Sequence, residues 1–105
     1  MGDGMTRQRL PNRRPCVTFD QKINNIDCTI SYGYAPEGGG VKELFINAGK
    51  SGEAIEGIMR DAATSISIAL QCGATPAELA HSITRNPDDK AASPIGVVLD
   101  DMVME

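Results

Sequence analysis

The segment from Glu43 to Gly73 restricts the fold more than any other part of this chain. It begins with a short apolar run, turns through Gly-Lys-Ser-Gly at 49–52, and continues as a long amphipathic pattern. Apolar residues recur there at helical spacing, which predicts a helix that buries one face. They are Ile55, Ile58, Met59, Ala62, Ile66, Ala69 and Leu70. Gly73 is a natural stop, because glycine adopts the left-handed capping conformation without steric cost.

Alternation of apolar and polar side chains predicts strands before the helix. Runs at 17–22, 26–34 and 41–48 carry it, and the middle run is the clearest. Asn24 and Asn25 separate the first two runs, and asparagine tolerates the positive φ values of a tight hairpin. We therefore expect an antiparallel meander of three or more strands, with one face in need of cover.

Two further helices are predicted after the long one. Thr75-Pro76 with Glu78 forms a capping-box pattern, and Ser93-Pro94 repeats the cap-then-proline start. Strands followed by helices are typical of an α+β fold, so we expect the long helix and two shorter helices to pack on one sheet face. Thr64, Ser65 and Ser67 are small polar residues within the long helix. They suggest close approach of another helix, from this chain or from a twin, and hence a homodimer.

A basic arm on an acidic body is the second prediction of organisation. Residues 1–15 contain four arginines and one aspartate, whereas the remainder has an acidic excess. A chain of 105 residues is long enough for one domain, so we expect a flexible arm at 1–15 and a single domain at 16–105. The arm could contact phosphates, stay solvated, or fold back onto the body. Nucleic-acid binding is disfavoured, because no aromatic residues interleave the arginines and the body would repel a polyanion.

The residue types favour no catalysis, no metal and no cofactor. Cys16, Cys28 and Cys72 are widely separated and match no metal-ligand spacing, so reduced thiols in or near the core are expected. His81 is the single histidine and has no cysteine nearby. The chain has neither an apolar run of membrane-spanning length nor a signal-like N-terminus, which predicts a soluble, cytoplasmic protein with no membrane partner.

Gly49-Lys50-Ser51 is placed between a strand and a helix, as the end of a phosphate-binding loop would be. The full motif requires glycine at position 44, where this chain has Leu44. A weaker expectation remains, because a helix N-terminus attracts anions. We predict an anion site at Lys50, Ser51 and Gly52, helped by Arg14 or Arg60. In the alternative, Ser51 only caps the helix.

Residues 49–73 resemble the C-terminal domain of adenosylcobalamin-dependent ribonucleotide reductases, which is grouped in the TSCPD domain family. The similarity extends upstream through the predicted strands, and Ser93-Pro94 with the last helix resembles the closing helix of that domain. The residues that carry it include Leu10-Pro11, Arg14-Pro15, Thr18, Glu43-Leu-Phe-Ile46, Lys50, Gly52, Ile55, Gly57, Met59, Ile66, Ser67, Ala69-Leu70-Gln71 and Gly73.

The departures from that family decide the functional expectation. The Thr-Ser-Cys-Pro-Asp motif is absent, Cys16 stands where the reductase domain tends to have glycine, and nothing resembles the catalytic barrel, the cobalamin site or the cysteine pair. Family membership thus points to ribonucleotide reduction, although the chain lacks its catalytic residues. The resemblance implies a non-catalytic accessory or regulatory module that docks to a ribonucleotide reductase or another nucleotide enzyme through its arm and an open sheet edge. The alternative is a small homo-oligomeric protein that binds a phosphorylated, nucleotide-like ligand at the predicted anion site.

Overall fold

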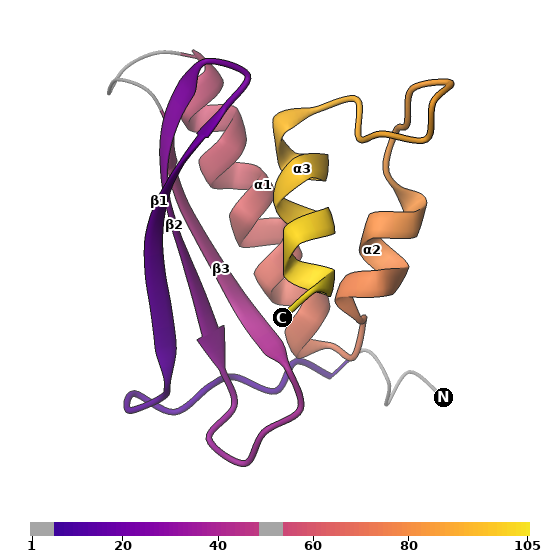
Figure 1. The fold of residues 1–105 in the computed structure, drawn as a ribbon. Coiled ribbons are helices and arrows are strands. Elements are labelled where there is room, and N and C mark those ends of the chain that lie inside the picture. The colour runs from indigo at the N-terminus through magenta and orange to yellow at the C-terminus, as the bar shows by residue number, and fades with distance from the viewer. Residues whose placement is uncertain (1–5, 49–53) are drawn as a thin grey trace.

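The computed structural model describes residues 6–48 and 54–105, which form a sheet covered by helices on one side (Figure 1). The sheet has the order β1-β2-β3, with all neighbours antiparallel. Its strands are β1 (Cys16–Ile23), β2 (Ile26–Tyr34) and β3 (Val41–Ala48). The helices are α1 (Ala54–Gln71), α2 (Pro76–Ser82) and α3 (Pro94–Val103). The predicted α+β fold, a meander followed by one long and two shorter helices, is confirmed.

Local sequence signals account for the turns and helix starts. Asn24 and Asn25 have φ values of 50° and 65°, as the two-residue hairpin between β1 and β2 requires. Gly73 has a φ of 112° just after α1. Thr75 and Glu78 complete the predicted capping box, and the Ser93 side chain accepts a hydrogen bond from the Gly96 N–H at the start of α3.

The core lies between the inner face of the sheet and helices α1 and α3. Ile30 and Tyr32 of β2 and Leu44 of β3 are fully buried there, as are Leu70, Val98, Leu99 and Met102 of the helices. Tyr32 also joins the layers, because its hydroxyl donates a hydrogen bond to Asp101 Oδ2 at 2.6 Å. Burial first, and this bond next, raise the pKa of Tyr32 above its ordinary value. The phenol therefore stays protonated and remains a donor.

The buried face of α1 differs from the predicted one. Ile58, predicted to be buried, is 63% exposed, and Val103 of α3 is 45% exposed. Met59, Ala63, Ile66 and Leu70 are buried, and the two polar residues Ser67 and Gln71 are buried beside them. The stripe is rotated because α1 packs along β3, and Figure 1 shows the helix running beside that strand.

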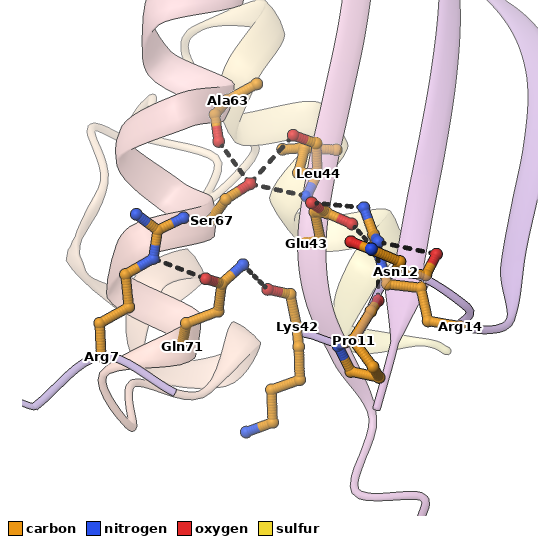
Figure 2. Close-up of polar contacts among 10 residues, drawn as sticks. All are labelled: Arg7, Pro11, Asn12, Arg14, Lys42, Glu43, Leu44, Ala63, Ser67 and Gln71. Atoms are coloured by element: carbon orange, nitrogen blue, oxygen red, sulfur yellow. Dashed lines mark hydrogen bonds and ion pairs between the residues drawn. The ribbon is translucent and has the colours of Figure 1, made fainter. Parts of the chain in front are cut away.

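Ser67 and Gln71 connect α1 to the outer edge of β3 (Figure 2). The Leu44 N–H donates to Ser67 Oγ at 2.8 Å, and that hydroxyl lies 3.0 Å from the Leu44 carbonyl and 2.9 Å from the Ala63 carbonyl. Gln71 Nε2 donates to the Lys42 carbonyl at 3.1 Å. The interpretation of Ser67 as a contact for another helix is therefore wrong, since its partner is a strand. Thr64 and Ser65 are exposed.

Replacing Ser67 with alanine is expected to lower the free energy of unfolding. The change leaves the buried Leu44 N–H without its acceptor, at a cost of about 1–3 kcal/mol. Urea denaturation followed by circular dichroism measures the loss. Ser65→Ala, an exposed position on the same helix, is the matched control and should change stability by less than about 0.5 kcal/mol. Equal effects of the two variants would contradict the proposed role of Ser67.

An ion pair holds the segment after α2 against α3. Arg85 Nη2 and Nη1 donate to Asp100 Oδ1 at 2.6 Å and to Oδ2 at 2.9 Å, and Arg85 Nη2 also donates to the Ala80 carbonyl. The hydrogen bond from Arg85 is the main cause that lowers the pKa of Asp100 below its ordinary value of 3.8. The charged carboxylate is thus favoured by folding.

The Arg85–Asp100 pair should give stability a defined pH dependence. Because the folded pKa of Asp100 is below the unfolded one, its contribution is present above pH 3.8 and is lost as the pH falls through the folded value. We expect Asp100→Asn to melt at a lower temperature than the wild-type protein at neutral pH. The difference should shrink in acid, as thermal melts across this pH range would show. A difference independent of pH would assign the effect to something other than the carboxylate charge.

Candidate functional site

Gln71 anchors the N-terminal arm to the body of the domain. The residue is 5% exposed, and its side chain uses both ends: Oε1 accepts from Arg7 Nε at 2.6 Å, and Nε2 donates to the Lys42 carbonyl. The Gln71 carbonyl accepts from the Gln8 N–H at 2.8 Å. One residue at the end of α1 therefore connects the helix, the β3 strand and the arm (Figure 2).

Arg14 makes the second attachment of the arm. Its Nε and Nη2 donate to Glu43 Oε1 at 2.7 Å and to Oε2 at 3.1 Å, and Nη1 donates to the Pro11 carbonyl at 2.9 Å. This fork-like geometry is the strong form of a guanidinium–carboxylate pair. Three roles were open for the arm: contact with phosphates, a solvated state, or folding back onto the domain. The contacts of Arg7, Gln8 and Arg14 are those of a segment folded back onto the domain.

Gly33 gives Glu43 the room that this pair requires. Gly33 lies opposite Cys16 of β1 on one side and Glu43 of β3 on the other. A Cβ added at Gly33 would lie 2.6 Å from Glu43 Oε1 and 3.0 Å from Glu43 Cβ. The missing side chain of β2 therefore lets the Glu43 carboxylate lie over that strand, where the Arg14 guanidinium reaches it.

Gly33→Ala is expected to destabilise the protein by displacing the Glu43 carboxylate. The cost should be about 1.5–3 kcal/mol, the value of hydrogen bonds to charged groups. Equilibrium denaturation of Gly33→Ala, Glu43→Ala and the double variant measures it. Because both single changes break the same contact, the double variant should lose less than the sum of the two losses. Additive losses would show that Gly33 acts independently of Glu43.

A cleft of about 440 Å³ lies between the arm, the turn after β2 and the end of α1. Its apolar lining includes Leu10 and Pro11 of the arm and Pro36 of the turn. Arg9 and Lys42 also line it, against the single carboxylate of Glu37. The cleft therefore combines apolar side chains with two cations and one carboxylate, and Gln71 holds the arm that forms one of its walls.

The described residues include only part of the predicted anion site. Lys50, Ser51 and Gly52 lie outside the described residues. Arg60 pairs with Glu56 Oε2 at 2.6 Å and donates to Asn47 Oδ1 at 3.3 Å. Arg14 instead pairs with Glu43, which precedes Asn47 by four residues on β3. At ~3.3 Å per residue, Glu43 and Asn47 are roughly 13 Å apart along the strand. The structure therefore does not bring Arg14 and Arg60 together. Arg60 shares with Arg7 a groove of about 470 Å³ between β3 and α1.

The cysteines and the histidine form no cluster within residues 6–48 and 54–105. The three thiols form no disulfide; Cys28 is buried, Cys72 is half-buried, and Cys16 is exposed, contrary to the expected position in or near the core. Burial, followed by the charge of Asp27, raises the pKa of Cys28, so that thiol stays protonated. His81 is exposed on α2. No group of metal-ligating side chains occurs in the described part of the chain.

Sequence analysis missed the residues that build the cleft. In the sequence, Gln71 stands out only as one of the family-like residues, Arg7 and Arg9 contribute only to the charge of the arm, and nothing singles out Lys42. The one available signal was the spacing of Ser67 and Gln71 from Met59, Ala63 and Leu70, since polar residues on a buried helical stripe need partners. That spacing shows that partners exist but does not identify them.

The TSCPD domain model matches residues 5–96, and this chain belongs to the TSCPD domain family. That family is linked to ribonucleotide reductase-type domains. The match begins within the arm, so the arm residues that contact Gln71 and Glu43 are part of the family domain. Comparison with curated proteins and with solved structures gave no match. Among the described helices, none combines the length and the hydropathy needed to cross a bilayer.

Proposed function

We propose that this protein is a non-catalytic accessory module of ribonucleotide reductase, and that it docks to the reductase through the cleft beneath the arm. The supporting observation is the family match, which takes in nearly the whole chain and links it to reductase-type domains. A module of this kind acts by binding a partner.

The chemistry of the cleft indicates what part of a reductase it would take. Its apolar lining favours aliphatic or aromatic side chains, and the Arg9 and Lys42 cations favour a carboxylate beside them. The proposed partner segment is therefore a peptide that presents an acidic residue next to apolar ones. Arg7 and Arg14 are engaged by the domain, so in this proposal the arm takes part in docking as a wall of the cleft.

A second candidate function is the binding of a phosphorylated, nucleotide-like ligand at Lys50, Ser51, Gly52 and Arg60. The observation in its favour is the groove between β3 and α1, which both Arg7 and Arg60 line. Each guanidinium uses only some of its donors on the protein, so the others are available to phosphate oxygens.

Charge reversal in the cleft tests the accessory function. We expect Arg9→Glu to weaken binding to the ribonucleotide reductase of the same organism roughly tenfold, because a repulsive charge replaces an attractive one at the rim. Titration calorimetry with purified reductase measures the affinity. Arg13→Glu is the matched control, since Arg13 is an exposed arginine of the same arm that does not line the cleft.

Three outcomes separate the candidates. Loss of affinity in Arg9→Glu alone supports docking through the cleft. Equal loss in both variants would mean that the arm contributes only through its overall positive charge, not through the cleft. No binding of wild-type protein to the reductase rejects the accessory function. Native mass spectrometry of the protein isolated gently from its organism then decides the second candidate, which requires a bound phosphorylated molecule of small mass.

A further inference from the structure

The two edges of the sheet are treated differently by the rest of the molecule. At the β3 edge, Ser67 and Gln71 of α1 bond to the main chain of Leu44 and Lys42. β1 is the opposite edge of the sheet, and none of the described helices covers it in Figure 1. An uncovered strand edge is a template for another strand, so proteins usually shorten, charge or cover it.

The ladder register shows which main-chain groups of β1 are free. The Tyr34 N–H donates to the Pro15 carbonyl at 2.9 Å, which makes this a hydrogen-bonded pair. Because such pairs alternate in an antiparallel ladder, Val17, Phe19 and Gln21 direct their main-chain groups toward β2. The groups that point outward therefore belong to Cys16, Thr18, Asp20 and Lys22. The same alternation leaves Leu44 facing outward on β3, in agreement with its bonds to Ser67.

This row of free groups is complementary to itself. An antiparallel copy of β1, placed about a twofold axis at Phe19, sets Cys16 opposite Lys22 and Thr18 opposite Asp20. Each outward residue then faces another outward residue over the whole strand, and every free N–H and C=O in the row finds a partner. A second copy thus satisfies the edge completely, as an isologous twofold contact should.

The side chains agree with that pairing. Residues that face one another lie on the same side of the sheet, so Phe19 meets Phe19 of the second copy on the inner face. Phe19 is only half-buried, and its ring lies edge-on to Tyr32 with the two ring centroids 5.4 Å apart. Val17, on the same face of β1, is 46% exposed although that face is the one the helices cover. Asp20 Oδ1 accepts from Thr29 Oγ1 at 2.8 Å, which holds the carboxylate toward β2 and away from its symmetry mate.

We infer that the β1 edge is a homodimer interface in which β1 pairs antiparallel with β1 of a second copy about a twofold axis at Phe19. The pairing joins the two sheets into one continuous sheet and places the helices of both copies on the same side. The exposed Val17 and the half-buried Phe19 then lie at the centre of the dimer. The interface is separate from the cleft beneath the arm, so it does not depend on the docking function proposed above.

The oligomeric state of two variants at Thr18 tests the edge. Thr18→Pro removes one outward N–H but no bond to β2, and proline is tolerated at such edge positions. Thr18→Ala keeps that N–H and is the matched control for the lost hydroxyl, which lies 2.8 Å from Ser31 Oγ. Sedimentation velocity across a wide concentration range should show a dimer for wild-type protein and Thr18→Ala and a monomer for Thr18→Pro. Circular dichroism checks that both variants are folded.

A cross-link tests the register without relying on proline. In the inferred pairing the exposed Cys16 faces Lys22 of the second copy, so Lys22→Cys should form a disulfide-linked dimer on mild oxidation. Lys22→Cys combined with Cys16→Ser is the control and should not form it. A monomeric wild-type protein would overturn the inference. A dimer that persists in Thr18→Pro, or that never cross-links in Lys22→Cys, would equally overturn it by placing the interface elsewhere.

Discussion

The hydrogen bonds from Ser67 and Gln71 to the edge of β3 are the interaction on which the rest of the structure depends. A helix can cover a sheet with apolar contacts alone, but such contacts do not fix its position along a strand. Here Ser67 is bonded at Leu44 and Gln71 at Lys42, so α1 has one position and one rotation relative to β3. That rotation leaves Ile58 exposed and brings Gln71 within reach of the arm.

Gln71 bonds both to the β3 strand and to the arm, so the position of α1 also determines where the arm lies. Its amide is nearly fully buried, so each of its hydrogen-bonding ends needs a partner, and the arm supplies one through Arg7. The Arg14–Glu43 pair, made possible by Gly33, secures the arm a second time. The cleft proposed for docking is therefore a consequence of how α1 is fixed on the sheet. The segment that the sequence predicts to be a flexible arm is one of its walls.

The sheet has one protected edge and one open edge, and this asymmetry separates internal from external contacts. The β3 edge is used inside the molecule, while β1 keeps a row of main-chain groups that pair with nothing else among the described residues. Membership of the TSCPD domain family links the chain to ribonucleotide reductase-type domains, and we propose that it acts through binding surfaces. The cleft and the β1 edge are two such surfaces, on different parts of the domain.

The amino-acid sequence by itself determined the elements and their order. Alternation defined the strands, Asn24-Asn25 the hairpin, and Thr75 with Glu78 and Ser93 with Pro94 the helix starts, because these signals act over a few neighbouring residues. Tertiary structure decided which face of α1 is buried, that Ser67 and Gln71 bond to a strand, and that Arg14 pairs with Glu43. Those contacts join residues that are distant in sequence, and a hydrogen bond or ion pair depends on distance in space, which local patterns do not contain.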